Sequence, residues 1–213
     1  MNIQWEKEST KFLFLLFVAD FAFIVIHIFY MNHFISNRLF SVEKDFGYAE
    51  VYQYIKELWI VVLLSITALK KKHIIYVAWA LLFMYFLFDD SLRIHELLGR
   101  RLVHHFHFQP MFDLRAQDFG ELCVSMVFGS LLFTFIGVSY LFSNDKVKQI
   151  SKHLFAFVLA LVFFGIVIDM LHVAIPTWGK PLFGLIEDGG EMLVMSVIVW
   201  YVFKLHTIPA NIK

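Results

Sequence analysis

The stretch "HIIYVAWALLFMYFLFDDSLRIHELLGRR", from His73 to Arg101, decides the class of fold. Its first half is an almost unbroken apolar run, long enough to enter a bilayer as a helix. Its second half gathers five ionisable residues, Asp89, Asp90, Arg93, His95 and Glu96. Three interpretations follow: the helix leaves the membrane here, the five groups pair with one another, or they build a site.

The composition indicates an integral membrane protein. The 213 residues are 60% hydrophobic and include 26 Phe but only 4 Pro, whereas soluble domains are about 45–50% apolar. The formal net charge is zero, so the charge does not indicate a nucleic-acid partner, and membrane lipids are the expected partners. The single cysteine, Cys123, excludes an intrachain disulfide. We expect residues 1–213 to form one membrane domain.

Six apolar segments predict the fold class: all-α, a polytopic membrane helical bundle with six transmembrane helices arranged as three helical hairpins. Helices are expected because every backbone polar group in hydrocarbon needs a partner within the protein. The expected spans are approximately residues 12–30, 52–69, 74–98, 119–142, 153–175 and 183–205.

The lysines predict the orientation of the bundle. An even number of spans puts both termini on one side of the membrane. On that side also lie the short connections "KKK" (Lys70–Lys72) and "NDKVKQISK" (Asn144–Lys152), whereas the longer connections opposite carry arginines such as Arg100 and Arg101. Lysine-dense short connections are typical of the cytoplasmic side. We therefore predict an integral membrane protein with both termini in the cytoplasm.

Three similar segments place glutamates at the outer ends of the even-numbered spans. They are "KELWIVVLL" (Lys56–Leu64), "GELCVSMVF" (Gly120–Phe128) and "GEMLVMSVI" (Gly190–Ile198). Glu57 and Glu191 each precede a cytoplasmic lysine by about 20 Å of helix. In a hydrocarbon core about 30 Å thick, they lie in the outer half of the membrane. Charged groups at that depth are costly unless they face a partner or a cavity, so we expect these glutamates to face the interior.

Helical spacing indicates which polar groups share a face. In "IDMLHV", Asp169 and His172 are three residues apart, and Glu187 and Glu191 are four apart. Several carboxylates in one interior cannot all stay ionised without a counter-charge. A divalent metal supplies it, and mixed carboxylate and imidazole ligands suit zinc, iron or manganese. Protonation of several carboxyls is the alternative, and plain interhelical hydrogen bonding is another.

These considerations give a candidate site. The expected metal ligands are Glu57, Glu121, Asp169, His172 and Glu191. Asp90 is expected to be a ligand or the general base that activates a bound water. Further candidates are His27, His95, Glu187 and Asp188.

The leading functional hypothesis is a divalent-metal site near the outer face that supports hydrolytic or redox chemistry on a lipid-like or small substrate. One alternative is a proton or divalent-cation transporter that uses the same carboxylates as a relay. Asp20 lies deeper than the other acidic residues, and an essential role for it would favour transport. Another alternative is a membrane scaffold or partner subunit without any site. The sequence leaves the oligomeric state open.

Some polar residues have a structural interpretation. Asp89, Arg93 and Glu96 fall on one stripe of a helix, which predicts an internal ladder of ion pairs. Asp90 and His95 are about 140° apart on the same helix, so of the two Asp90 is the better candidate to face the site. The cluster "VHHFHF" (103–108) is interpreted as an interfacial loop, and Gly189–Gly190 as a helix break or a point of close helix approach.

The stretches "DDSLRIHE" (Asp89–Glu96) and "EDGGEMLVMSVIVWYVF" (Glu187–Phe203) resemble motifs of bacterial polytopic membrane proteins of unknown function. The two motifs are Asp-Asp-x4-His-Glu at the end of one helix and Glu-Asp-Gly-Gly-Glu at the start of the last. The resemblance implies a helical bundle in a bacterial inner membrane but no activity. A histidine–carboxylate site inside helices is also similar to that of membrane zinc hydrolases such as alkaline ceramidases. Their His-x-x-x-His motif does not occur here, so this likeness is architectural only.

Overall fold

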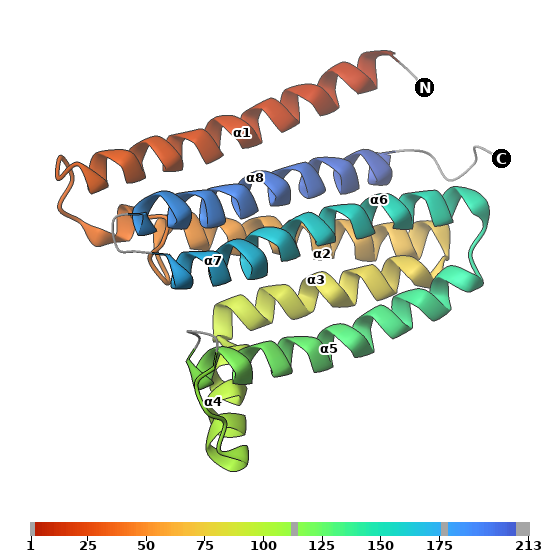
Figure 1. The fold of residues 1–213 in the computed structure, drawn as a ribbon. Helices are drawn as coiled ribbons and strands as arrows, with labels where there is room; N and C mark the ends of the chain where they lie inside the picture. The colour runs from red at the N-terminus through yellow and green to blue at the C-terminus, as the bar shows by residue number, and fades with distance from the viewer. Residues whose placement is uncertain (1–2, 112–114, 176–178, 208–213) are drawn as a thin grey trace.

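The computed structural model describes residues 3–111, 115–175 and 179–207, and in these residues the fold is all-α, as predicted (Figure 1). The elements in chain order are α1 (Ile3–Met31), the 3₁₀ turn η1 (Arg38–Phe40), α2 (Tyr48–Lys71), α3 (Ile74–Leu92), α4 (Ile94–Phe106), α5 (Ala116–Leu141), α6 (Asp145–Val162), the π-helix η2 (Phe163–Ile168), α7 (Asp169–Ala174) and α8 (Lys180–Thr207).

Five helical segments are long and apolar enough to cross a membrane. They are Glu8–Met31, Tyr48–Lys71, Ile74–Leu92, Ala116–Leu141 and Asp145–His172. The length and composition of these five segments therefore agree with the predicted membrane-spanning character. The helix α8 is not among them, although it has 28 residues. It runs alongside the long helices and contacts α1, α2 and α6 (Figure 1).

Several helices begin earlier than the apolar segments predict. The first turns of α1, α2, α5 and α6 contain polar residues that the hydropathy pattern leaves out of the expected spans. A helix continues through such residues because its hydrogen bonds are internal, and hydropathy reports only the part that suits hydrocarbon. For these four helices the apolar segments located the element correctly but placed its start too late.

The expected continuous helix over 74–98 is wrong. The helix α3 ends at Leu92, and Arg93 adopts a left-handed backbone conformation with φ 52° and ψ 47°. The chain then turns sharply into α4, which leaves the bundle at a steep angle (Figure 1). The side chain of Asp89 accepts a hydrogen bond of 2.8 Å from the backbone N–H of His95, which stabilises the first turn of α4.

The helix α4 is held against α5 by two glycines. A Cβ atom at Gly120 would lie 2.5 Å from the carbonyl oxygen of Gly99, and one at Gly99 would lie 2.8 Å from the backbone nitrogen of Glu121. The two backbones therefore touch where the helices cross. Contrary to the interfacial-loop interpretation of 103–108, residues 103–106 form the last turn of α4.

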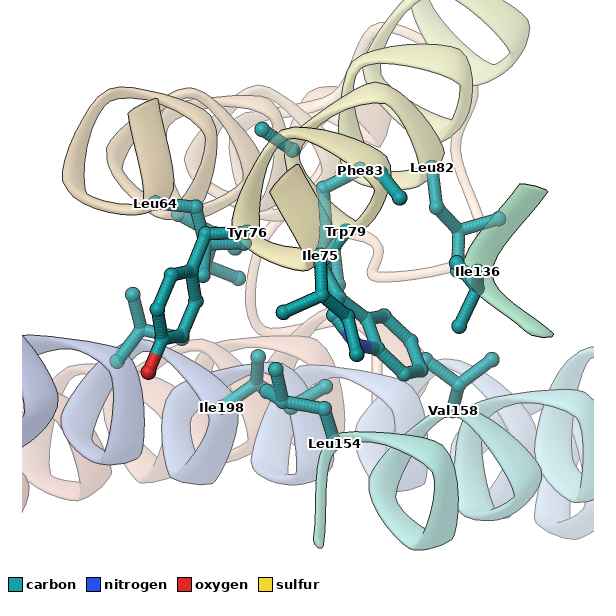
Figure 2. Close-up of a cluster of buried hydrophobic side chains, with 14 of the residues drawn as sticks. Leu64, Ile75, Tyr76, Trp79, Leu82, Phe83, Ile136, Leu154, Val158 and Ile198 are labelled. Carbon is teal, nitrogen blue, oxygen red and sulfur yellow. The ribbon is translucent and has the colours of Figure 1, made fainter. Parts of the chain in front are cut away.

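A dry core fills the half of the bundle nearest the Lys70–Lys72 turn. It is built around Trp79 and Tyr76 on α3, with Leu64, Leu154 and Ile198 packed against them (Figure 2). All five side chains are almost fully buried. The indole N–H of Trp79 donates a 2.9 Å hydrogen bond to Ser151 Oγ, so the one polar atom of the Trp79 side chain has a partner. This core closes the bundle at one end, and the polar residues gather at the other.

Candidate functional site

A cavity of about 550 Å³ opens at the end of the bundle where α4 leaves it. It lies between α2, α3, α5, the α6–η2–α7 segment and α8. A smaller cavity of about 270 Å³ adjoins it and shares Gln53, Asp90, His95, Glu187 and Glu191. The volume of the larger cavity is within the roughly 300–1,000 Å³ typical of small-molecule sites.

The structure brings most of the expected site residues to this cavity. Among the expected ligands, its walls include Glu57, Glu121, Asp169 and Glu191, and Asp90 lies on the same wall as Glu57. His95 and Glu187 line it as well, and Asp188 lines the smaller cavity. The remaining two candidates, His172 and His27, are bonded to other residues, as described below.

Glu57 and Asp90 form the central feature of the site. Glu57 is only 1% exposed, and its Oε2 has no hydrogen-bond donor among the described residues. Its carboxyl group lies within hydrogen-bonding reach of the Asp90 carboxyl group. Two ionised carboxylates are both acceptors, so neither satisfies the other. A proton or a metal ion between them is required to make this contact favourable.

A second buried acceptor lies one turn away on the same helix. The side-chain Oε1 of Gln53 also has no partner among the residues that the structure describes, and it faces both cavities. Buried acceptors without donors are rare in folded proteins and mark positions where a ligand, an ion or water completes the bonding. Tyr54, between them in sequence, donates a 3.3 Å hydrogen bond to the backbone carbonyl of Asp90 and so ties α2 to α3.

Glu191 is positioned by two glycines and a π-helix. A Cβ atom at Gly165, within η2, would collide with the Glu191 carboxylate, and one at Gly190 would collide with the ring of Phe164. The two helices therefore interlock, each placing a large side chain over a glycine of the other. Single π-turns within α-helices occur often at functional sites. The helix α8 continues through Gly189 and Gly190, so these residues allow close approach and do not break the helix.

His172 and Glu187 form a separate pair. His172 Nδ1 lies 2.9 Å from Glu187 Oε2, which joins α7 to α8. Asp169, one turn before His172, lines the cavity. Glu121 accepts a 2.8 Å hydrogen bond from Gln117, one turn earlier on α5.

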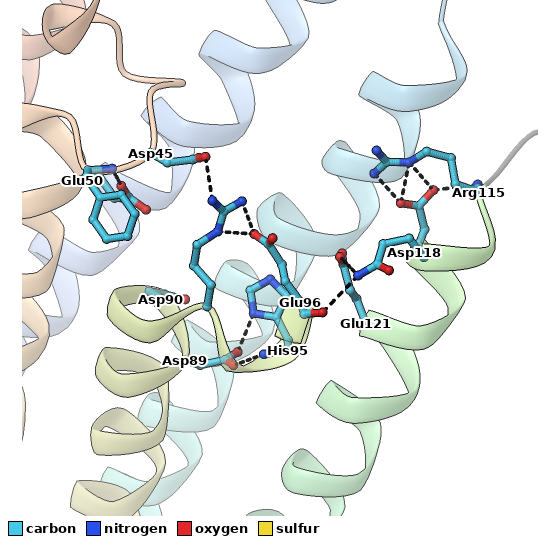
Figure 3. Close-up of polar contacts among 12 residues, drawn as sticks. Asp45, Glu50, Asp89, Asp90, His95, Glu96, Arg115, Asp118 and Glu121 are labelled. Carbon is cyan, nitrogen blue, oxygen red and sulfur yellow. Dashed lines mark hydrogen bonds and ion pairs between the residues drawn. The ribbon is translucent and has the colours of Figure 1, made fainter. Parts of the chain in front are cut away.

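The expected ladder of Asp89, Arg93 and Glu96 forms only in part (Figure 3). Arg93 pairs with Glu96 at 2.5 Å and with Asp45 of the α1–α2 connection at 3.3 Å. Asp89 instead bonds His95, whose Nδ1 lies 3.0 Å from Asp89 Oδ2. Because the helix breaks at Arg93, the 140° separation does not apply, and His95 faces the same cavity as Asp90.

The environment of His95 favours its charged form. Burial alone would lower its pKa, but the hydrogen bond to Asp89 and the negative charges of Asp89, Glu121 and Asp90 outweigh burial. The pKa of His95 is therefore raised above its ordinary value. A protonated His95 supplies positive charge to an otherwise acidic wall.

His27 has a structural role. It is 1% exposed, and its Nδ1 accepts a 3.2 Å hydrogen bond from the backbone N–H of Val42 and lies 3.3 Å from Ser41 Oγ. Its Nε2 lies 4.0 Å from Glu43. This histidine therefore fastens the α1–α2 connection to α1, an arrangement that residue spacing does not reveal.

The candidate metal ligands do not converge into one cluster. Within residues 3–111, 115–175 and 179–207, no group of three or more histidine, cysteine, aspartate or glutamate side chains lies close enough to hold a metal ion. The closest approaches are pairs: Glu57 with Asp90, Asp89 with His95, and His172 with Glu187. Any metal here would take two protein ligands at a time and complete its shell with water or substrate.

Sequence reasoning missed one residue, Lys56. It is fully buried, and its Nζ lies 3.1 Å from Asp20 Oδ1 and 2.8 Å from the carbonyl oxygen of Met192. Ser196 Oγ donates a 2.6 Å hydrogen bond to the other oxygen of Asp20. Asp20 is also fully buried. The signal was present in the sequence, because Lys56 and Asp20 are opposite charges within apolar segments and each needs a partner.

Comparison with known proteins gives a family but no activity. Residues 12–207 match the family described as Domain of unknown function (DUF8692). No curated protein and no solved structure matches the chain.

Proposed function

We propose that this chain, which belongs to the DUF8692 family, holds a divalent cation in its acidic cavity and uses it in hydrolytic or redox chemistry on a lipid-like or small substrate. The observation that supports this proposal is the contact of Glu57 with Asp90, in which one buried acceptor lacks any described donor. A cation between the two carboxylates removes both the repulsion and the unsatisfied atom.

Zinc, iron and manganese all suit the donors at this site. The two histidines near the cavity, His95 and His172, bond Asp89 and Glu187 through Nδ1, which leaves each Nε2 available as a metal ligand. The available donors are therefore carboxylate oxygens and imidazole nitrogens, which these three metals accept. Glu57 and Asp90 are the proposed ligands. Glu191, which faces the same cavity, is the proposed general base for a metal-bound water.

The proposal includes a topology. We propose that α8 is a sixth span, so that the bundle consists of three helical hairpins with both termini in the cytoplasm of a bacterium. Its 28 residues extend about 42 Å at 1.5 Å per residue. Its many contacts with other helices also allow it to carry Glu187, Asp188 and Glu191 inside the bundle. In this orientation the cavity opens toward the outer face.

A second candidate function is proton or cation transport. The specific observation that favours it is the ion pair of Lys56 with Asp20, which lies within the spanning segments and next to Glu57. Ionisable groups at this depth often belong to transport pathways. The dry core around Trp79 closes the other end of the bundle. Transport would therefore require a second conformation, whereas a one-sided binding site would not.

Metal content is the test. The protein is purified in detergent after growth with supplementary manganese, iron and zinc, and bound metals are counted by elemental mass spectrometry. We expect one equivalent of metal, retained in a Glu8→Gln control and lost in a Glu57→Gln, Asp90→Asn double variant. Glu8 is a suitable control carboxylate because it is exposed and, among the described residues, pairs with Lys11 in the same helix.

Two results would reject the metal proposal: a wild-type protein without metal, or a folded double variant that still binds it. Proton flux is then measured in liposomes. Flux that is lost in a Lys56→Met, Asp20→Asn variant would support the second candidate.

A further inference from the structure

The cavity changes character along its length. The wall formed by α5 runs from Asp118 and Glu121 through Ser125 to Gly129 and Phe133. These residues recur at three- and four-residue steps, so they form one stripe on the helix. The stripe carries charged residues at its outer end, small residues in the middle and an aromatic residue at its inner end.

The opposite wall shows the same gradient. On the α6–η2–α7 segment the lining residues are Asp169 and Met170 at the outer end, then Ile166, Gly165 and Val162, and finally Leu161 and Val158. Two helices from opposite sides of the cavity therefore become apolar in the same direction. A water-soluble ligand would fill only the charged end and leave the apolar end empty.

The apolar end is blind and lies within the membrane. Leu82, Val158 and Met195 close it, and each is at most 2% exposed. Just below, the rings of Phe133 and Phe155 contact each other edge to face, with centroids 5.7 Å apart. This contact joins α5 to α6 near their connecting turn.

Above that contact the two helices separate. Figure 1 shows α5 diverging from α6 toward the α4 end. The helix α5 packs mainly on α3 and α4 and touches α6 only slightly. Gly129 lies on the cavity-lining stripe of α5, and a Cβ atom added there would meet nothing within 4 Å. At Gly129 the cavity wall is therefore not covered by another side chain, which leaves room for a lateral entrance.

We propose that the ligand of this cavity is a membrane lipid with an amine-bearing headgroup, held with one acyl chain in the apolar end. The lipid enters from the outer leaflet between α5 and α6. Its ammonium group lies near the rim carboxylates Glu121 and Asp169. Asp118, on the same rim, is already paired with Arg115, whose Nη2 lies 2.6 Å from Asp118 Oδ1. This inference rests on the proposed function and narrows its substrate class to a lipid.

Charge and unsatisfied bonding both support an amine-bearing lipid. Arg115 and His95 line the cavity, but its acidic residues outnumber them, so the rim attracts an ammonium group and repels a headgroup that is only anionic. Independently, Gln53 Oε1 is a buried acceptor that faces this cavity without a donor among the described residues, and the proposed cation between Glu57 and Asp90 does not use it. Such atoms point to a polar ligand group at the deep end of the charged region.

Photo-crosslinking tests the inference. The protein is reconstituted in vesicles of phosphatidylethanolamine and phosphatidylglycerol, with a small fraction of phosphatidylethanolamine carrying a diazirine in the distal half of its acyl chain. Labelled residues are mapped by mass spectrometry. We expect labelling of Phe133, Val158 and Met195 above that of Met126 and Leu131, which are exposed on the outer face of α5.

Two glycines on α5 provide a matched pair of variants. Gly129 and Gly137 both have open space around them, but only Gly129 is part of the described cavity wall. Gly129→Phe should fill the apolar end and abolish labelling of Val158 and Met195, whereas Gly137→Phe should leave it unchanged. Competition needs no variant: excess unlabelled phosphatidylethanolamine should reduce labelling, and phosphatidylglycerol should not.

The inference is overturned if Val158 and Met195 are labelled no more than Met126, or if folded Gly129→Phe is labelled like the wild type. Equal competition by phosphatidylglycerol would overturn the amine-bearing headgroup. The experiment is repeated after chelation. Labelling in a protein that never binds metal would reject the metal proposal alone, and metal binding without labelling would reject the lipid alone.

Discussion

At the scale of single residues, the ion pair of Lys56 and Asp20 is the most consequential contact outside the cavity. Both side chains are fully buried, and Lys56 Nζ also lies 4.7 Å from the centre of the Tyr52 ring. Removing one partner leaves an uncompensated charge in a dry interior, which typically costs about 3–5 kcal/mol. We predict that Lys56→Met and Asp20→Asn each reduce the free energy of unfolding in mixed micelles by about that amount.

The double variant provides the control for this prediction. Lys56→Met with Asp20→Asn removes both charges, so its stability should recover most of the loss of either single variant. Losses that simply add in the double variant would show that the two charges do not depend on each other. The energetic coupling that we predict between Lys56 and Asp20 would then be wrong.

His95 gives a prediction for pH dependence. Its pKa is raised in the folded protein, chiefly through Asp89 once the opposing effect of burial is overcome. The resulting stabilisation is fully present below the ordinary histidine pKa of about 6.5 and is lost as pH rises through the raised folded value. Compared with His95→Asn, the wild type should have its largest advantage in melting temperature near about pH 5.5, and the advantage should shrink at higher pH.

Thermal denaturation of both proteins in one detergent across this range is the measurement. Asparagine keeps a side-chain donor for Asp89 but carries no charge, so the difference reports the protonated histidine. A constant difference in melting temperature at every pH would contradict the assignment of a charged His95.

For single residues, the sequence predicted correctly which carboxylates face the interior when their depth in the membrane decides this. Glu57, Asp90, Asp169 and Glu191 all face the cavity, as expected for carboxylates that are too deep for water and too costly for lipid. It could not identify partners that lie in loops. The partners of His27 are Ser41 and Val42 in the α1–α2 connection, and no periodicity relates a helix to the loop that folds over it.

At the scale of elements, the interlock between η2 and α8 controls the shape of the cavity. The ring of Phe164 occupies the space that a side chain at Gly190 would need. We predict that Gly190→Ala lowers the free energy of unfolding by about 1–3 kcal/mol through overpacking. Gly137→Ala on α5 meets nothing within 4 Å and should be neutral or stabilising by about 0.5–1 kcal/mol, because alanine favours a helix more than glycine does.

A compensating substitution makes the Gly190 prediction specific. A Phe164→Leu change in the Gly190→Ala background removes the ring, so stability should return toward that of Phe164→Leu alone. If the double variant is instead as unstable as the sum of both changes, the ring contact is not the cause.

The break between α3 and α4 shows what an element-level pattern misses. The segment "SLRI" (91–94) contains neither glycine nor proline, so it gives no local signal for a helix end. The turn depends on Arg93 in a left-handed conformation, on its bonds to Asp45 and Glu96, and on the touching backbones of Gly99 and Gly120. Tertiary contacts thus decide a boundary that the hydropathy of 74–98 leaves continuous.

At the scale of the whole molecule, the bundle has two unlike ends. The dry core around Trp79 fills one end, and the cavity with its carboxylates occupies the other. The two meet at Val158, which belongs to both. A bundle sealed on one side is suited to bind and transform a ligand that arrives from the other side, and this is why we rank binding and catalysis above passage through the protein.

The number of spans decides whether this arrangement is correctly oriented. Five helical segments are apolar enough to cross a membrane, and α8 is not among them. It carries Glu187, Asp188 and Glu191 in its first half and Lys204 in its last turn. If α8 crosses as the sixth span, the two termini lie on the same side. If it does not cross, they lie on opposite sides. We predict six spans, with the Lys70–Lys72 turn and both termini in the cytoplasm.

Reporter fusions measure directly on which side of the membrane each terminus lies. A fluorescent protein that matures only in the cytoplasm should be bright at either terminus, and alkaline phosphatase should be inactive there. Phosphatase inserted after Gln109, beyond α4, should be active. A bright N-terminus with an active phosphatase at the C-terminus would show that α8 does not cross.

In that case Glu187 and Glu191 would belong to a re-entrant or surface helix. The cavity would then have to open to water much more widely than the burial of Glu57 implies. Same-side termini with an active insertion after Gln109 would place the acidic rim, and any substrate it receives, at the outer face.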